Sequence, residues 1–90
     1  MSLLEVIKKD ILSKNAFVDY LKEINERELA LAHFSIGMYI RNKYLWGKDD
    51  NINELSCIYG VSTPDEISGK ILREVYADLH NASHSSNPKR

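Results

Sequence analysis

The segment HFSIGMYIRNKYLW, residues 33–46, decides the fold of this 90-residue chain. It is apolar on nearly every side of a helix, yet it carries Gly37 in its middle and the polar pair Arg41 and Asn42 near its end. A helix at the surface of a globular protein keeps one polar face, whereas a helix that is apolar all round is buried. The segment therefore predicts the central helix of a small bundle, with a polar feature near one end.

Capping patterns divide the rest of the chain into further helices. A Ser, Thr or Asn followed three residues later by Glu, ahead of an apolar run, marks a helix start. The pattern occurs at Ser2–Glu5, Asn25–Glu28, Asn51–Glu54 and Thr63–Glu66. It predicts one or two helices over 3–24, a long helix over 25–44, a short helix over 52–59 that ends at Gly60, and a last helix over 64–80. A break at 13–15 and one unbroken first helix both fit the apolar pattern.

No segment alternates between polar and apolar residues for long enough to predict a strand. We therefore expect an all-α fold, a compact bundle of four to five helices with a long, largely buried central helix. A composition of 43% hydrophobic and 28% charged residues suits one globular domain. We place that domain at 1–80 and predict a disordered C-terminal tail at 81–90, which lacks an apolar anchor.

Charge and cysteine content exclude several classes of protein. The chain has 12 basic and 13 acidic residues, a formal net charge of −1, so it offers no general attraction to nucleic acid or to an anionic membrane. Its single cysteine, Cys57, excludes an internal disulfide. No apolar run approaches the ~20 residues of a membrane span. Acidic Glu5 and Asp10 do not fit a signal peptide, so we expect a cytoplasmic protein.

Arg41 projects from a mostly apolar face, one helical turn after Gly37. A buried guanidinium needs a carboxylate or several carbonyl acceptors, because an unpaired buried charge is costly. Asp65 and Glu66 are the expected internal partners, and the alternative is that Arg41 anchors a carboxylate or phosphate of a ligand. The glycine lets a second helix, with Gly69 as its facing surface, or the stem of Arg41 approach closely.

His33 lies two turns before Arg41, and the simplest interpretation is a core histidine bonded to a hydroxyl such as that of Ser68. Metal binding needs further ligands at suitable spacing, and none accompanies His33. One thiol and one imidazole form no catalytic motif. We expect no enzymatic activity, no metal and no cofactor. The polar candidates, for binding or for structure, are His33, Arg41, Asn42, Asp65 and Ser68.

Three aromatic residues, Tyr39, Tyr44 and Trp46, are candidate contact residues because they interleave with Arg41 and Lys43. Such a pattern suggests stacking on bases. On a helix, however, Arg41 and Lys43 point about 200° apart and form no single basic stripe. We therefore expect core packing for these aromatics, and no nucleic-acid binding.

The same residues resemble an uncharacterised bacterial family of small helical domains of unknown function. Its pattern is H-F-x-x-G-x-x-I-R-N, then Leu-Trp, then P-D-(D/E)-x-S before a final apolar helix. The likeness runs over about 25–80 in this chain, through residues 33–46 and 64–68. It departs at Ser35, where the family often has glycine, and at Leu45-Trp46, which lies one residue closer to Asn42. The resemblance implies that Arg41, Asn42 and Asp65 belong together and brings no activity with it.

A small, neutral, compact helical domain works most simply by covering a partner's surface. We therefore expect a non-enzymatic protein-binding module, comparable in size and class to immunity proteins, antitoxins and phage-encoded inhibitors. Its partner is unidentified, and a homodimer is one form this binding takes. One alternative is a small-ligand or nucleotide binder that uses Arg41 and Asn42. A second is a DNA-binding regulator built on the helices at 52–59 and 64–80.

Overall fold

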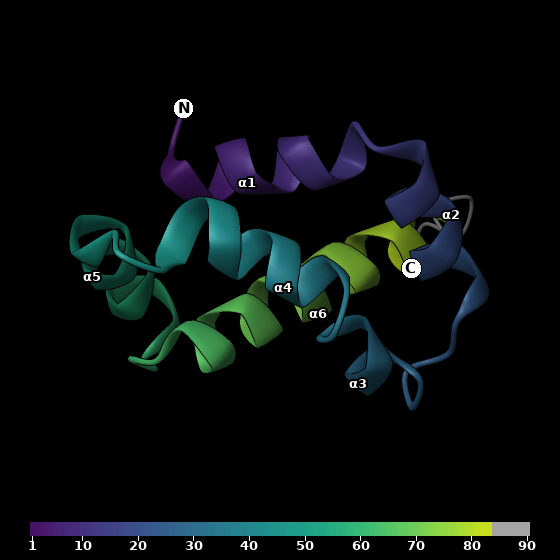
Figure 1. The fold of residues 1–90 in the computed structure, drawn as a ribbon. Helices are drawn as coiled ribbons and strands as arrows, with labels where there is room; N and C mark the ends of the chain where they lie inside the picture. Colours follow the sequence, from purple (N-terminus) through teal and green to yellow (C-terminus); the bar gives the residue numbers. More distant parts are fainter. Residues whose placement is uncertain (84–90) are drawn as a thin grey trace.

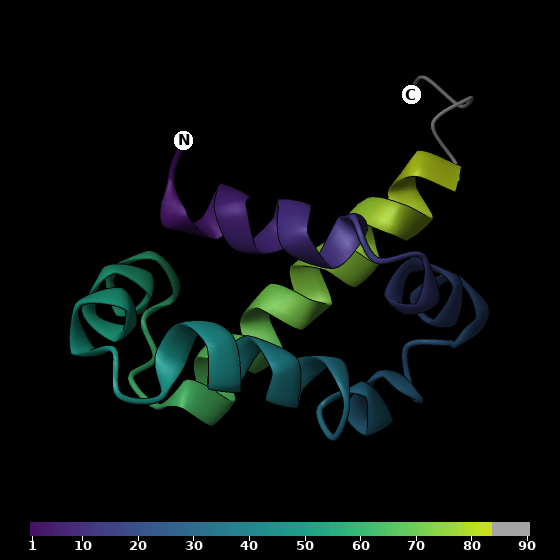
Figure 2. The ribbon, with the colours of Figure 1, turned by 45° about the horizontal axis from the view of Figure 1, so that its top comes forward.

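The last helix, α6 (Pro64–Ser83), runs through the middle of the molecule and contacts α1, α2, α4 and α5. The structure is a computed structural model that describes residues 1–83. In it α1 (Leu3–Leu12) lies along one side of α6, and α4 (Ile36–Ile40) crosses α6 on another side (Figures 1 and 2). Helix α5 (Asp49–Tyr59) packs near the beginning of α6 and α2 (Asn15–Glu23) near its end. This arrangement confirms the all-α bundle.

The first part of the chain forms two helices, which settles the open boundary. Helix α1 ends at Leu12, and the backbone at Lys14 is extended before α2 begins. The hydroxyl of Ser13 donates to the carbonyl of Asp10 at 2.6 Å and caps the end of α1. Asn15 is the first residue of α2 and makes no capping bond from its side chain.

The capping patterns differ in what they produce. Ser2 and Glu5 exchange both bonds of a capping box, and the Thr63 hydroxyl accepts from the amide of Glu66 at 3.2 Å. Gly60 ends α5 with a left-handed φ of 73°, as predicted. The predicted cap at Asn51 is wrong, because α5 begins two residues earlier. The Asn51 amide instead donates to the carbonyl of Tyr44 at 2.9 Å.

The predicted long central helix is interrupted. Asn25 and Glu28 do exchange two capping bonds, but residues 26–28 form a turn, and the helix α3 that follows covers only Leu29–Ala32. A second turn at 33–35 separates α3 from α4, with Ser35 outside the helical region at φ −123° and ψ −78°. The chain then passes directly from α4 into the π-helix η1 (Arg41–Leu45). The expectation of one continuous helix over 25–44 is therefore wrong.

The break has a tertiary cause. The carbonyl of His33, which in a continuous helix would accept from the amide four residues on, accepts from Arg41 Nη2 at 3.0 Å. In η1 the Trp46 amide donates to the Arg41 carbonyl at 2.8 Å, five residues back, so this turn is wider than an α-helical turn. Leu45 is buried by this turn, and Trp46 is half exposed.

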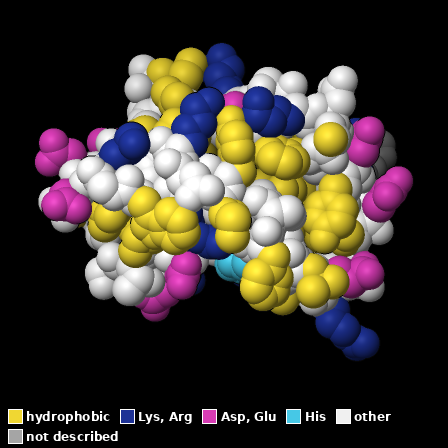
Figure 3. All heavy atoms as spheres, viewed as in Figure 1, with side chains coloured by type: hydrophobic (Ala, Val, Ile, Leu, Met, Phe, Trp, Pro, Cys, Tyr) yellow, Lys and Arg dark blue, Asp and Glu magenta, His cyan; other side chains and the backbone are white. Residues whose placement is uncertain are grey.

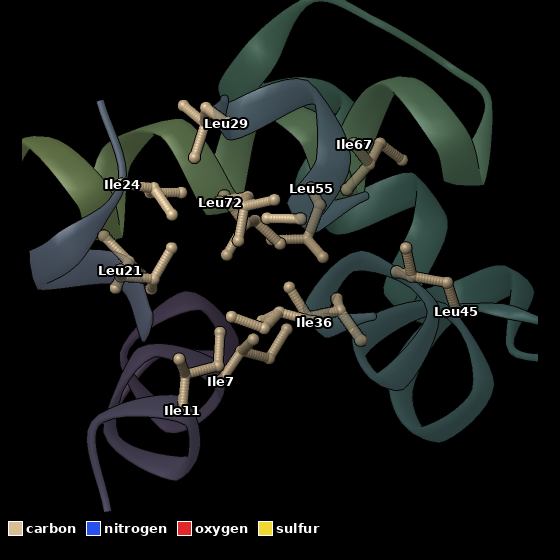
Figure 4. Packing of buried hydrophobic residues seen from close by; sticks show 14 residues of the cluster. Ile7, Ile11, Leu21, Ile24, Leu29, Ile36, Leu45, Leu55, Ile67 and Leu72 are labelled. Atoms are coloured by element: carbon tan, nitrogen blue, oxygen red, sulfur yellow. The ribbon is translucent and has the colours of Figure 1, made fainter. Parts of the chain in front are cut away.

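Side chains from every helix meet in one hydrophobic core. Figure 4 shows them converging from the α1 side, from α2 and from α4 onto α6. The fully or nearly fully buried apolar residues are Ile7, Ile11, Leu21, Ile24, Leu29, Ala32, Ile36, Ile40, Leu45, Leu55, Ile67, Ile71, Leu72 and Val75. Arg41 and Ser68 are the polar residues buried beside them. Only one side of the central segment is buried, because Phe34, Met38 and Trp46 are exposed, so the expectation of one largely buried helix is wrong.

The end of the chain differs from the predicted boundary at 80. Helix α6 continues to Ser83, so the first three residues of the predicted tail are helical. The remainder of that tail, 84–90, lies outside the described residues. Over 1–83, none of the helices combines the length and the apolar character that a bilayer crossing requires.

Candidate binding surface around Arg41

Arg41 is held by neutral acceptors from two other parts of the chain. Its Nη1 donates to the hydroxyl oxygen of Ser68 on α6 at 2.9 Å, and its Nη2 donates to the carbonyl of His33 at 3.0 Å. The Ser68 hydroxyl in turn donates to the carbonyl of Asp65 at 3.1 Å. The Arg41 side chain is only 8% exposed. The guanidinium therefore ties η1 to both α6 and the turn after α3.

The carboxylate of Asp65 supplies the predicted ion pair, but a loose one. Its Oδ1 lies 3.4 Å from Arg41 Nε, and the Asp65 side chain is 82% exposed. Within the described residues Nε has no hydrogen-bond partner, although it is buried. Glu66, the other predicted partner, does not pair with Arg41; its Oε1 accepts from the Thr63 hydroxyl at 3.0 Å. The buried cation thus keeps one donor unused.

Two glycines make this arrangement fit. A Cβ added at Gly37 would lie 3.1 Å from Arg41 Nη1, so the missing side chain gives the guanidinium its space. This confirms that Arg41 approaches Gly37, with its head group rather than its stem. Gly69 does not face Gly37, as had been one expectation. A Cβ there would lie 2.6 Å from Cε1 of His33, so the glycine accommodates the imidazole.

The His33 ring does not bond to Ser68 as predicted. The Ser68 hydroxyl already accepts from Arg41 and donates to the Asp65 carbonyl, so it has no proton left for the ring. Within residues 1–83 the half-buried imidazole makes no hydrogen bond of its own. His33 therefore contributes to the site through its backbone carbonyl and through the shape of its ring.

A surface hollow of about 320 Å³ opens beside these groups and is called the Arg41 hollow below. It is lined by His33, Phe34, Arg41, Asp65 and Glu66. A second hollow of about 330 Å³ lies on the other side of His33. That second hollow is lined by His33, Val61, Glu66, Gly69, Lys70 and Arg73. The accessible charge in the Arg41 hollow is mostly negative, because Arg41 is buried whereas Asp65 and Glu66 are exposed.

Exposed apolar side chains occur on the segment that contains the Arg41 hollow, and one of them, Phe34, lines it. We call Leu31, Phe34, Met38 and Trp46 the apolar face; Phe34 is 75% and Trp46 49% exposed. The Trp46 ring centroid lies 5.8 Å from Arg41 Cζ, within range of a cation–π contact. Figure 3 shows hydrophobic side chains gathered on the side of the molecule where α3 and α4 face the viewer.

Asn42 does not join the polar group. Its side chain is exposed, does not line the hollow and makes no hydrogen bond within the part of the chain that the structure describes. Neighbouring residues on a helix project in different directions, so Arg41 is buried while Asn42 stays at the surface. Of the five polar candidates, the structure therefore brings together His33, Arg41, Asp65 and Ser68.

The three candidate aromatics divide in the same way. The hydroxyls of Tyr39 and Tyr44 donate to Oδ2 of Asp10 at 2.8 and 2.6 Å, and Lys43 Nζ reaches the same oxygen at 2.9 Å. Asp10 lies on α1, so this Asp10 cluster fastens α1 to α4 and η1. Trp46, by contrast, stays half exposed on the apolar face. The expectation of core packing is therefore wrong for Trp46, about half of whose surface is open to a partner.

The Asp10 cluster is electrostatically satisfied. Burial alone would raise the pKa of Asp10, but hydrogen bonds from Tyr44, Lys43 and Tyr39 outweigh burial and hold the pKa well below its usual value. Burial together with the Asp10 carboxylate raises the pKa of Tyr44 to about 12. The same carboxylate raises the pKa of Lys43. All three groups therefore keep their ordinary charge at neutral pH.

Sequence reasoning missed Asp10 and the exposure of Phe34 and Met38. Asp10 directly precedes buried Ile11, and an acid at the edge of an apolar stripe is a usable signal of internal pairing. Residues 31, 34 and 38 follow the same helical period as the buried residues 29, 32 and 36. Two apolar faces on one segment could have indicated that one of them is exposed.

Metal-ligand geometry and the thiol add little to this picture. In residues 1–83, no three side chains of His, Cys, Asp or Glu come together in a way that could hold a metal ion. Cys57 is exposed on α5 and does not line the Arg41 hollow. What the site offers chemically is an apolar surface, two accessible carboxylates and a firmly held guanidinium.

The chain belongs to the DUF6794 family, a domain of unknown function, which matches residues 9–79. This confirms the resemblance to an uncharacterised family, and it extends the likeness from the predicted start at 25 back through α2 and into the last turn of α1. No curated protein and no solved structure matches the chain. The family therefore brings a domain of unknown function, and the function of this chain has to be argued from its surface.

Proposed function

For this member of the DUF6794 family, we propose non-enzymatic binding of a partner protein through the apolar face. The observation that carries the proposal is the exposure of large apolar side chains between residues 31 and 46, above all Phe34, which is 75% exposed and lines the Arg41 hollow. Single exposed apolar residues are ordinary, but grouped ones beside a hollow mark interaction sites. A partner that covers them removes their unfavourable contact with water.

The apolar face is not explained by the needs of the core. Leu29, Ala32 and Ile36 already supply the buried side of this segment, and they leave Leu31 and Phe34 outside. A polar residue at 34 would cost the fold little, because Phe34 is 75% exposed and buries little surface on folding. Apolar residues there are better explained by a contact made after folding.

The polar groups near the hollow support binding rather than catalysis. Ser68 is fully buried, and its hydroxyl proton is directed to the Asp65 carbonyl, so no group frees the oxygen to attack a substrate. Two of the Arg41 nitrogens are occupied by internal acceptors. A ligand pocket built on Arg41 and Asn42 is not favoured, because Asn42 lies outside the hollow.

Immunity proteins, antitoxins and phage-encoded inhibitors are the classes that this proposal resembles in size and mode of action. We place the function in the cytoplasm of a bacterial cell, whether the source is the bacterium or its phage. The exposed free thiol of Cys57 suits a reducing compartment. The choice of a bacterial cell rests on the resemblance of residues 33–46 and 64–68 to a bacterial family.

Co-purification with matched surface variants tests the proposal. Tagged wild type, the double variant Phe34→Asp/Met38→Asp and the control Ile58→Asp are recovered from the cells that make the protein. Ile58 is exposed on α5, so its variant adds an acid without touching the apolar face. We expect a partner with wild type and with the control, and its loss with the double variant at an unchanged melting temperature.

Two results would contradict the proposal. One is a partner retained at full level by the double variant, which would place the contact elsewhere on the surface. The other is a monomer without any partner protein above background. A second copy of the chain as the partner would appear as a concentration-dependent dimer that the double variant abolishes, and it would support the same face.

A further inference from the structure

The charges around the Arg41 hollow indicate the kind of partner that the apolar face fits. We propose that the Arg41 hollow receives a basic side chain, Lys or Arg, of the partner protein, seated between the ring of Phe34 and the carboxylates of Asp65 and Glu66. This inference rests on the proposed function and adds to it the chemistry of the partner segment: a basic residue next to a run of apolar ones.

The accessible charge in the hollow is acidic. Asp65 is 82% exposed and only one of its oxygens lies near Arg41, so the other is open to a second donor. Glu66 is exposed, pairs with no cation in the described residues, and uses one oxygen to accept from Thr63. Arg41 neutralises part of this charge through its ion pair with Asp65, but its side chain is too buried to contact a ligand directly.

An anionic visitor fits the hollow less well. To reach the unused Nε of Arg41, a partner's carboxylate would have to displace Asp65 and then lie next to Glu66. The partner's carboxylate and Glu66 carry the same charge and would repel each other, which lowers the affinity of binding. A cation instead adds a favourable contact with both acids and leaves the existing ion pair in place.

Aromatic rings complete the recognition of a cation. Phe34 lines the hollow with a largely exposed ring, against which the aliphatic stem and the charged head of Lys or Arg both pack well. Trp46 lies close to Arg41 on the same apolar face. The residues that flank the partner's basic side chain are therefore expected to be apolar.

The second hollow limits the direction of the bound segment. Lys70 and Arg73 line it, and Arg73 is already paired with Glu26 at 3.3 Å. These cations would repel a second basic residue on that side of His33. The partner segment is therefore expected to leave the Arg41 hollow over Phe34 and Met38, with its basic residue at one end of an apolar run.

Peptide selection tests this inference without knowledge of the partner. A library of random linear peptides displayed on phage is selected against the wild-type protein, and the enriched peptides are measured against variants. We expect enrichment of Lys or Arg next to aromatic or aliphatic residues. Binding should fall about tenfold or more with Glu66→Lys and with Phe34→Ala, and weaken as salt is added. The control Glu54→Lys changes the net charge equally on exposed α5 and should leave binding intact.

Enrichment of acidic peptides would overturn the inference and make Arg41 the anchor. Purely apolar peptides that ignore Glu66→Lys, peptides that respond equally to Glu54→Lys, or no enrichment at all would also overturn it. Because Glu66→Lys could disturb the cap of α6, Glu66→Gln is measured beside it, and the unfolding of every variant is checked. Each of these failures leaves co-purification through the apolar face as a separate test of the proposed function.

Discussion

Asp10 and Arg41 are two charges withdrawn from solvent at contacts with the same α4–η1 segment, and they differ in how fully they are satisfied. Asp10 is 13% exposed, and one of its oxygens accepts from Tyr39, Lys43 and Tyr44. Arg41 is similarly buried, but its acceptors are a hydroxyl and a carbonyl, and its one acid lies at 3.4 Å without a hydrogen bond. The acid is surrounded by donors, whereas the cation is only partly paired.

The difference separates a structural contact from a candidate binding site. Three donors satisfy the Asp10 carboxylate, so the Asp10 cluster holds α1 in place and has little capacity left to bind a partner. The acid beside Arg41 is mostly in water and keeps free capacity, and exposed Phe34 and Trp46 stand next to it. A partner can bind here by pairing with the carboxylate that is only loosely paired inside the molecule and by covering the exposed aromatic rings.

The largest effect is expected from Arg41→Ala. The substitution removes a buried side chain and leaves the Ser68 hydroxyl and the His33 carbonyl without their donor. Unfolding by urea should show a loss of about 3 kcal/mol. Arg73→Ala is the control, because its pair with Glu26 is exposed and should contribute less than about 0.5 kcal/mol. Equal losses for the two variants would contradict the structural role of Arg41.

Asp10→Asn should have the next largest effect, about 2 kcal/mol at neutral pH, because charge-assisted bonds from three donors are weakened together. Asp19→Asn is the matched control, because Asp19 is exposed on α2, and it should leave the free energy of unfolding nearly unchanged. If both variants unfold like wild type, the Asp10 cluster does not hold α1.

The same carboxylate predicts a dependence on pH. Since the pKa of Asp10 is lower in the folded chain than in the unfolded one, the folded state binds its proton more weakly. Its stabilisation is complete above the unfolded pKa of about 3.9 and is lost as the pH falls below that value. Unfolding measured from neutral pH into this acidic range should show a steeper loss for wild type than for Asp10→Asn. Glu5 and Glu74, whose pKa values are also lowered, leave a residual slope in the variant.

A smaller effect is expected when Gly69→Ala and His33→Ala are combined: their effects on the free energy of unfolding should deviate from additivity by about 1 kcal/mol. Alanine in a helix interior is favoured over glycine by roughly this amount. In wild type the added Cβ would lie 2.6 Å from Cε1 of His33, so Gly69→Ala should gain nothing or lose stability. In a His33→Ala background the same change should stabilise. A double-mutant cycle measures the coupling, and simple additivity would show that the ring does not pack there.

Asp65→Asn should have the smallest effect on stability, below about 1 kcal/mol, because the carboxylate is 82% exposed and only loosely paired. Comparison with Arg41→Ala in the same urea experiment separates two contributions to the free energy of unfolding: the hydrogen bonds from Arg41 to its neutral acceptors, and its ion pair with Asp65. A loss as large as that of Arg41→Ala would mean that the ion pair, and not Ser68 and His33, keeps Arg41 buried.

Helix starts and stops were largely predictable, because capping bonds join residues three apart. Ser2 with Glu5, Thr63 with Glu66 and the left-handed Gly60 form what their spacing indicates. Asn25 and Glu28 show the limit of such reasoning. They form their capping box, yet the helix after it stops at Ala32. A local pattern states how a helix can begin and does not state how far the rest of the molecule lets it run.

The amino-acid sequence by itself determined the all-α class, most helix ends and the need of Arg41 for an acceptor, since these follow from short-range spacing and from the cost of a buried charge. Only the tertiary structure decided that the acceptors are Ser68, 27 residues away, and the His33 carbonyl, and that the chain breaks at 33–35 to present that carbonyl. It also decided which apolar side of 29–46 is buried. The reason is that α6 packs against one side of this segment, and the apolar residues on the other side remain exposed to solvent.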